Sequence, residues 1–115
     1  MLLAMAPTIC MAQSPSAKED RAQLAQCAAA YKVAKALLAK SPKSKASQTR
    51  FIVATDRLAT ATMFSNVLTP HMKYPQALHL YREVLKVDPN NNEARTNSRM
   101  IISVYQSMHR PVPKD

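Results

Sequence analysis

Residues 74–94 carry the sequence YPQALHLYREVLKVDPNNNEA, and this stretch decides the fold. Its apolar residues recur at three- and four-residue steps, which places them on one face of an α-helix. They are Ala77, Leu78, Tyr81, Val84 and Leu85. Asp88 and Pro89 end the pattern, because the residue before a proline avoids helical backbone angles. Asn90 and Glu93 then have the spacing of a capping box, so another helix is predicted to start there.

Apolar spacing and helix-ending residues together predict four helices along the chain. The first spans about residues 17–40, with Ser16 and Glu19 as its capping box. The third begins at Tyr74-Pro75, with proline at the first helical position, and the fourth runs from its Asn90 cap to about residue 108. Residues 109–115 contain two prolines and are predicted to form an extended tail.

The second helix is predicted to be long. It begins after Ser41, with Pro42 in its first turn, and Pro70 is the residue that stops it; later starts near Ser44 or Ser47 remain open. Such a helix would be about 40 Å long. Its apolar face follows a seven-residue repeat through Phe51, Ala54, Leu58, Ala61, Ser65 and Leu68.

The composition excludes several classes of protein. The 115 residues include no glycine, whereas average usage predicts about eight. Phosphate-binding glycine loops, glycine-rich dinucleotide motifs and Asn-Gly hairpin turns therefore cannot form. Helix formers such as alanine, leucine and lysine dominate instead. The predicted fold is all-α, with four antiparallel helices joined by short connections, as a short α-solenoid or a small bundle.

The stretch that decides the fold resembles the second helix and the following boundary of a tetratricopeptide repeat (TPR). The family's small, aromatic, apolar and proline positions are filled by Ala77, Tyr81, Val84 and Pro89. The resemblance covers about residues 58–108, and a fainter copy lies 47 residues earlier, at Ala30, Ala34, Leu37 and Pro42. It implies a stack of helical hairpins that binds other proteins.

The resemblance also implies a concave binding face on the first helix of each repeat. Matched residue by residue, it places six side chains there: Ala59, Thr62, Asn66, Thr69, Asn97 and Arg99. The alternative is that these are ordinary polar surface residues. The family's clamp for peptide carboxylates pairs a lysine with an asparagine one turn later, and here Thr62 stands in place of the lysine.

The net charge of +9 suits an anionic partner; the alternative is that it simply keeps a small protein soluble. Lys43, Arg50 and Arg57 follow one another at seven-residue steps, so they would form a basic strip along one edge of the second helix. The strip would bind an acidic surface or a nucleic acid, or else be a solvated flank whose aliphatic stems cover apolar surface. Nucleic acid is the less favoured partner, because the strip carries no aromatic residues for base stacking.

Catalytic and metal-binding patterns are missing from the sequence. His71, His79 and His109 are not four residues apart on one helix face, and no Ser/His/Asp or Cys/His set can be assembled. Cys10 and Cys27 lack the spacing of a zinc site. We therefore predict a non-enzyme that uses no metal and no cofactor.

The amino end predicts export. Residues 1–12, MLLAMAPTICMA, are uncharged, largely apolar and end in a small residue, as a secretory signal peptide does; residues 13–16 would link it to a helical domain over residues 17–108. The apolar run is too short to be a transmembrane span. We expect an exported or periplasmic protein; the alternative is a cytoplasmic one with an amino-terminal tail.

Stacked repeats usually need about three copies to cover their core, and this chain offers at most two. Unless the second helix packs against all three others, an open end face is expected at Met100, Ile101 and Val104, which would pair with another protein or a second copy. The sequence thus predicts a non-catalytic TPR-like module for protein binding, a scaffold or adaptor. The alternative is a basic helical protein that binds an anionic polymer.

Overall fold

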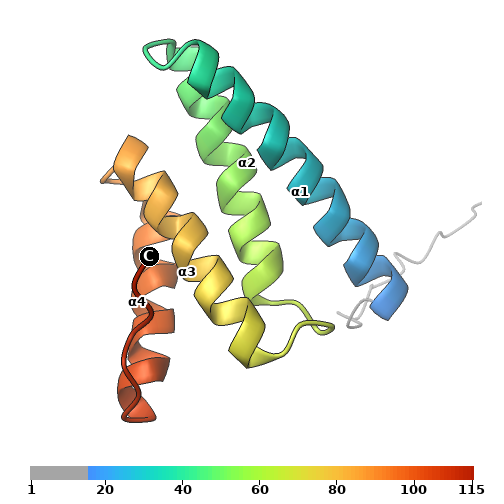
Figure 1. Cartoon of the computed structure of the whole chain (residues 1–115), viewed down its shortest axis with the longest axis vertical. Coiled ribbons are helices and arrows are strands. Elements are labelled where there is room, and N and C mark those ends of the chain that lie inside the picture. The colour runs from blue at the N-terminus through green and yellow to red at the C-terminus, as the bar shows by residue number, and fades with distance from the viewer. Residues whose placement is uncertain (1–15) are drawn as a thin grey trace, which may run out of the picture.

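The computed structural model describes residues 16–115, which form four α-helices and contain no strand. The helices are α1 (Ala17–Lys40), α2 (Lys45–Met63), α3 (Pro70–Val87) and α4 (Asn92–Ser107). Each helix runs roughly opposite to the one before it (Figure 1). The predicted all-helical fold with four helices is confirmed.

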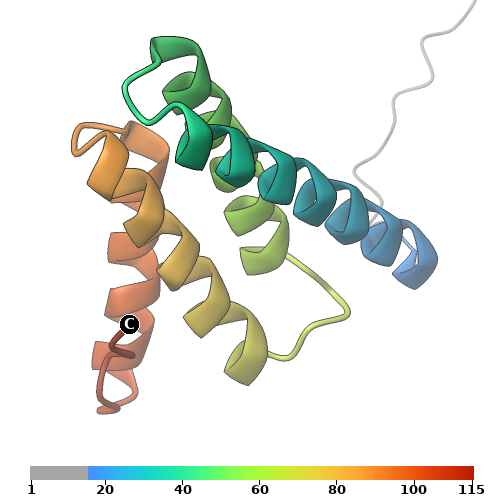
Figure 2. The same ribbon diagram turned by 45° about the horizontal axis from the view of Figure 1, so that its top comes forward.

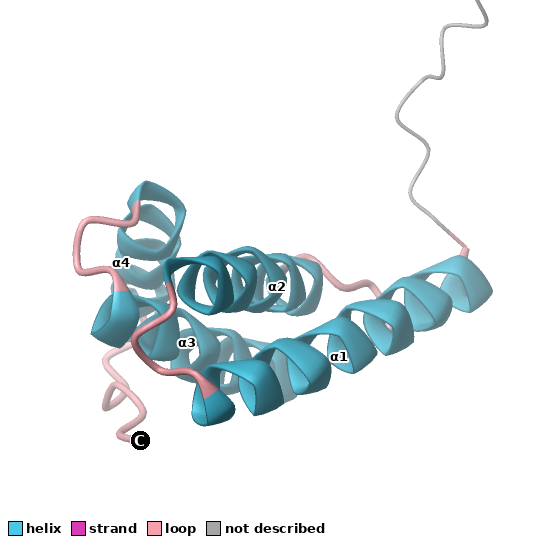
Figure 3. Cartoon of the chain, turned by 90° about the horizontal axis from the view of Figure 1, so that it is seen from above, coloured by secondary structure: helices cyan, strands magenta, loops and turns pink. Residues whose placement is uncertain are grey.

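The helices pack in the order of the chain. The main contacts join α1 to α2, α2 to α3, and α3 to α4. Figure 2 and Figure 3 show the result: α2 and α3 are central, and the amino-terminal half of α1 extends away from α3 and α4. The arrangement is a small open bundle, in which α2 does not pack extensively against all three other helices.

The main core lies where α2, α3 and α4 meet. Its fully buried residues include Ala59, Ala77, Leu78, Tyr81, Val84, Ala94 and Ile101. A second and smaller cluster joins α1 to α2 through Ala34, Phe51 and Ala54, with the rings of Tyr31 and Phe51 6.1 Å apart. Ala34 is the only apolar residue of α1 that is buried, and Tyr31 and Leu38 of the same helix are partly buried against this cluster.

The second helix is shorter than predicted. It begins after Ser44, one of the alternative starts, and ends at Met63, so it is about 28 Å long. Pro70 does not stop it; instead Pro70 occupies the first position of α3, where the missing N–H costs nothing. The predicted start of α3 at Tyr74-Pro75 is therefore wrong, and Pro75 lies inside the helix.

Ser65 explains why α2 ends early. Its side-chain oxygen accepts hydrogen bonds from the backbone N–H groups of Val67 and Leu68, at 3.1 and 3.2 Å. Such bonds stabilise a turn in competition with the helix. The Ser65 hydroxyl also donates to the buried carboxylate of Asp20, on α1, at 2.6 Å. Asp20 thereby holds the loop between α2 and α3 against the first turn of α1.

The helix caps are partly as predicted. The Ser16–Glu19 capping box is present at the start of α1. The predicted box of Asn90 and Glu93 is wrong: Asn91 caps α4 by accepting from the N–H of Ala94 at 2.9 Å. The shift of one residue arises because the side chain of Asp88 accepts from the N–H of Asn90 and so extends the turn.

The segment after α4 turns sharply and then lies against α3, where Arg82 bonds to Pro113 and Asp115. His109 has a φ of 54°, and the N–H groups of His109 and Arg110 bond back to the carbonyls of Gln106 and Tyr105. This is a Schellman motif, which glycine usually completes. The following residues are non-helical, and Val112 packs against the main core.

We predict that Ser65→Ala lowers the free energy of unfolding by about 2 to 3 kcal/mol, because it leaves the buried carboxylate of Asp20 without its hydroxyl donor. Chemical denaturation measures the change. Ser103→Ala, which removes an exposed hydroxyl bonded only within α4, should change stability by less than about 0.5 kcal/mol. Equal stability of the two variants would contradict the role assigned to Ser65.

We predict that His109→Gly raises the free energy of unfolding by about 0.5 to 1 kcal/mol, because glycine adopts a positive φ without the clash of a Cβ. His71→Gly is the matched control: His71 lies in the first turn of α3, where glycine should destabilise by about 1 kcal/mol. Thermal melts of both variants test the pair, and a lower melting temperature for H109G would refute the argument.

Candidate functional site

A concave groove with a volume of about 730 Å³ lies between α1 and α2. We call it the α1–α2 groove. Its apolar surface comes from Cys27 and Ala30 on α1 and from Ala46, Val53 and Ala54 on α2. Most of these side chains are small, and no residue of α3 or α4 lines the space that they leave between the two helices.

Cations border this groove. Lys45, Arg50 and Arg57, all exposed and all on α2, contribute to its lining, and we call them the basic rim. No carboxylate is among the residues that line it. Among residues 16–115, none of the three cations forms an ion pair within the chain. The rim is therefore free to attract an anionic group.

The groove continues into a second hollow of about 500 Å³, which shares Cys27 and Arg57 with it. Phe64 lines this hollow and is 60% exposed, the highest value among the exposed large apolar side chains of the described residues. Asp20 and Glu93 also line it. The whole surface thus has exposed apolar side chains, a cationic end near Lys45 and acidic groups beyond Arg57.

Two of the three residues of the predicted basic strip belong to this surface. Arg50 and Arg57 lie on the basic rim, as their spacing on one side of the helix requires. Lys43 lies in the turn between α1 and α2 and does not line the groove, whereas Lys45 does. The seven-residue spacing selects Lys43 and not Lys45, because it takes no account of where α2 begins.

The predicted concave face is not a single exposed surface. Ala59 and Thr62 are 0% and 3% exposed, and the hydroxyl of Thr62 donates to the carbonyl of Leu58, so placing them in an open groove was wrong. They face the main core because α3 packs on that side of α2.

The other four residues of that face are scattered. Asn66 and Thr69 are exposed in the loop between α2 and α3, and Arg99 is exposed on α4. Asn97 is half-buried and donates to the hydroxyl of Tyr81 at 2.8 Å. None of the four lines the α1–α2 groove.

The predicted packing residues lie in the core. Ala77, Tyr81 and Val84 are all 0% exposed, and Pro89 follows the end of α3. The hydroxyl of Tyr81 accepts from Asn97 on α4 and lies 2.6 Å from the hydroxyl of Thr60 on α2. Burial raises the pKa of Tyr81, so its hydroxyl stays protonated and can donate to Thr60.

The predicted open end face on α4 is mostly closed. Ile101 is 0% exposed and belongs to the main core, so its assignment to an exposed face was wrong. Val104 is half-buried, and only Met100, at 47% exposure, is open to solvent. Of Met100, Ile101 and Val104, only Met100 is exposed, and one side chain offers too little apolar surface for a stable interface.

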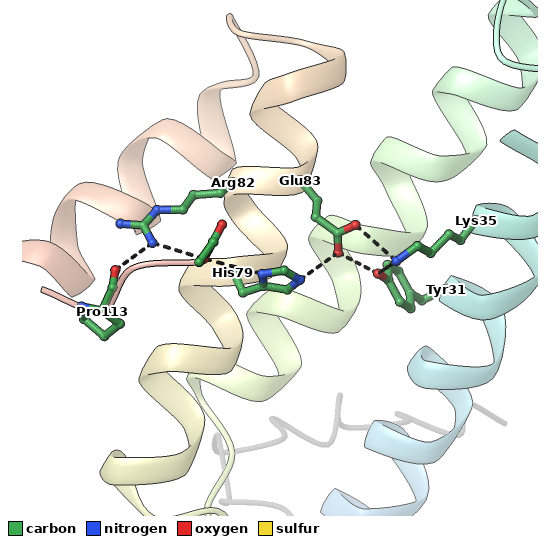
Figure 4. A network of polar contacts seen from close by, with 7 residues as sticks. Tyr31, Lys35, His79, Arg82, Glu83 and Pro113 are labelled. Carbon is green, nitrogen blue, oxygen red and sulfur yellow. Dashed lines mark hydrogen bonds and ion pairs between the residues drawn. The ribbon is translucent and has the colours of Figure 1, made fainter. Parts of the chain in front are cut away.

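A polar network joins α1, α3 and the carboxyl-terminal segment, as Figure 4 shows. The hydroxyl of Tyr31 donates to Glu83 at 2.6 Å, and Lys35 lies 3.4 Å from the same carboxylate. His79 lies between Glu83 and Asp115, at 3.5 and 3.4 Å. Arg82 donates to the carbonyl of Pro113 at 2.7 Å and to the carboxylate of Asp115 at 3.1 Å.

This network acts as a structural link. Burial and the hydrogen bond to Glu83 raise the pKa of Tyr31, and the hydrogen bond to Tyr31 raises the pKa of Lys35. Both groups are thus kept protonated at neutral pH, the opposite of what a nucleophile or general base needs. His79 and Glu83 are one turn apart on α3, as their spacing requires, whereas the contact of Glu83 with α1 depends on the fold.

Asp56 is a buried carboxyl with incomplete hydrogen bonding. It is 8% exposed, and its Oδ1 atom has no hydrogen-bond partner in the described residues. Burial, aided by the negative charges of Glu93 and Asp88, raises its pKa to about 6. Its position on α2 beside the α3–α4 connection therefore makes Asp56 a weaker acid than an exposed aspartate, although a hydrogen bond from Asn91 opposes the rise in pKa.

Within residues 16–115, no group of three or more histidine, cysteine or acidic side chains is arranged to hold a metal ion. None of the four helices has the length and apolar character that crossing a membrane requires. The predicted signal peptide, residues 1–12, lies outside the described residues.

Comparison of the chain with protein-family models, with curated proteins and with solved structures finds no match.

We predict that the free energy of unfolding falls by about 3 kcal/mol as pH rises from about 4 to above 6, through Asp56 alone. The folded state binds this proton more tightly than the unfolded chain, so ionisation favours unfolding. Asp56→Asn should therefore be more stable than the wild type at about pH 7.5 and similar to it near pH 4. Chemical denaturation across this pH range measures the difference.

Glu19→Gln is the control for Asp56, because Glu19 is exposed and glutamine preserves its capping role. It should show no gain in stability at about pH 7.5. A D56N protein less stable than the wild type at that pH would mean that the carboxylate is stabilised by a partner.

Proposed function

We propose that this chain is a non-catalytic protein-interaction module, a scaffold or adaptor, which holds a segment of another protein in the α1–α2 groove. The observation that carries the proposal is the groove itself, an uncovered space of about 730 Å³ that is lined by small apolar side chains and by the basic rim. Concave, mostly apolar surfaces with a few polar groups are where binding partners are usually held.

The helix packing supports a TPR-like module of this kind. Ala77, Tyr81 and Val84 are fully buried between neighbouring helices, as the resemblance to that family requires, and Pro89 follows the helix end. In the fainter copy, Ala34 is fully buried, but Ala30 is exposed in the groove. The first helix therefore lacks the neighbour that covers Ala77 in the later copy.

The alternative function, binding of an anionic polymer, is favoured by one observation, the basic rim with no ion pairs among the described residues. The apolar lining between α1 and α2 supports a protein partner better, because phosphate contacts need no apolar surface. Export of the chain remains a further proposal, which rests on residues 1–12 alone.

We predict that a photo-activated cross-linker attached to Cys27, in a Cys10→Ser protein, captures a partner from extracts of the natural host. Cys27 is a free thiol that lines the groove. The adduct should disappear in Val53→Glu, which places a charge in the groove, because Val53 is 43% exposed and its replacement leaves the core intact.

Met100→Glu is the matched control for Val53→Glu: Met100 has a similar exposure of 47% but lies on α4, away from the groove. It should preserve the adduct. If both variants give the same adducts as the parent protein, the groove is not the binding surface.

A further inference from the structure

The two halves of the chain are related by a shift of 47 residues, which places α1 on α3 and α2 on α4. In the later half, a third helix covers the pair: α2 packs along α3 and reaches α4 at a few points. Thr60 of α2 is hydrogen-bonded to Tyr81 of α3 and to Glu93 of α4, at 2.6 and 2.9 Å. Ala59 and Met63 of α2 belong to the same core as Ala77.

In the earlier half, no described helix takes the corresponding place. Ala30, which corresponds to the fully buried Ala77, is exposed and lines the α1–α2 groove. Ala46 and Arg50 correspond to Glu93 and Asn97, the α4 residues whose side chains bond to Thr60 and Tyr81, and both line the groove as well. The groove is therefore the site where a helix equivalent to α2 would lie.

The charge of the groove indicates which helix fits it. Lys45, Arg50 and Arg57 line it, and no carboxylate does; the carboxylates of Asp20 and Glu93 line the adjoining hollow, which Arg57 borders as well. A second copy of this chain is a poor occupant, because each copy has a net charge of +9. Residues 1–15 of the same chain are also a poor occupant, because they contain no acidic residue.

We infer that the α1–α2 groove binds an acidic amphipathic helix of another protein, which lies against α1 and α2 as α2 lies against α3 and α4. This inference rests on the proposed function and specifies its partner. The apolar side of that helix contacts Cys27, Ala30 and Val53. Carboxylates two helical turns apart on its flank pair with Arg50 and Arg57, which are seven residues apart on α2.

The length of the partner helix follows from α2. The lining extends from Lys45 to Phe64, so an occupant of about 18 residues, about 27 Å long as a helix, spans it. Its acidic residues belong at the Lys45–Arg57 end, because Asp20 and Glu93 line the hollow beyond.

Synthetic peptides test this inference with the full-length protein. The probe is a labelled peptide of about 18 residues, with leucine and alanine on one helical face and glutamate on its flanks. The first control has the same composition in an order that removes the apolar face, and the second replaces every glutamate by lysine. Fluorescence anisotropy measures affinity, and circular dichroism measures the helix gained on binding.

We expect the acidic amphipathic peptide to bind, to gain helicity, and to bind at least about 10-fold more tightly than either control peptide. The double variant Arg50→Glu/Arg57→Glu and the variant Val53→Glu should each weaken binding by about 10-fold or more. Arg99→Glu and Met100→Glu, both exposed on α4, should stay within about 2-fold of the wild type. High salt should weaken binding several-fold.

Several results would overturn the inference. Equal binding of the lysine peptide, or failure of the acidic peptide to bind, excludes an acidic partner helix. Binding without a gain of helicity indicates an extended partner. If single-stranded DNA binds as tightly as the acidic peptide, and Val53→Glu does not weaken that binding, the partner is a polyanion. If the Cys27 adduct still forms and is lost in V53E, the groove remains the binding surface and only the partner's chemistry is wrong; if that adduct is also missing, the proposed function fails as well.

Discussion

The side chain of Tyr81 is the interaction on which the main core depends. Its ring is fully buried where α2, α3 and α4 meet, and its hydroxyl is bonded to Asn97 and to Thr60. Thr60 donates in turn to the carboxylate of Glu93. Since a buried hydroxyl without a partner would destabilise the protein, the three helices must keep the spacing that satisfies it. One aromatic residue thus provides both apolar volume and a polar link between three helices.

The first helix is held differently, and this difference creates the candidate site. Its buried residues are Asp20 and Ala34, and Tyr31 and Leu38 pack against the cluster that Ala34 forms with Phe51 and Ala54. The carboxylate of Asp20 holds the α2–α3 loop, and the hydroxyl of Tyr31 reaches Glu83 on α3. These contacts fix the position of α1 at separate points but leave the space beside Cys27 and Ala30 unfilled. The α1–α2 groove is therefore a consequence of how α1 is attached.

The loops show how a chain without glycine makes its turns. A serine hydroxyl shapes the α2–α3 loop, an asparagine side chain caps α4, and His109 takes the left-handed conformation after it. Hydroxyl, amide and carboxyl groups bond to nearby backbone N–H groups and stabilise turns that glycine allows in other proteins. The predicted boundaries around Ser65 and Asn90 were wrong for this reason. The side chain of Ser65, not a proline, ends α2, and the side chain of Asp88 displaces the cap of α4 by one residue.

Much of the candidate site could not be derived from residue spacing. The seven-residue step identified Arg50 and Arg57, because residues at that spacing share one side of any helix. It could not identify Cys27, Lys45 or Val53, which join the same surface only when α1 lies beside α2. The assignment of Ala59 and Thr62 to an open face was wrong because burial depends on which neighbour covers each side of α2.

The amino-acid sequence by itself determined that the protein is helical, that it has four helices, and that Ala77, Tyr81 and Val84 share one apolar face of the third. These properties follow from local spacing, from capping residues and from the absence of glycine. Only the tertiary structure decided which faces of α1 and α2 stay uncovered, that Asp20 and Glu83 hold α1 in place, and that Asp56 is buried without a full set of partners. The reason is physical: helix formation depends on residues within a few positions of one another, whereas exposure, pairing and pKa depend on groups brought together from distant parts of the chain.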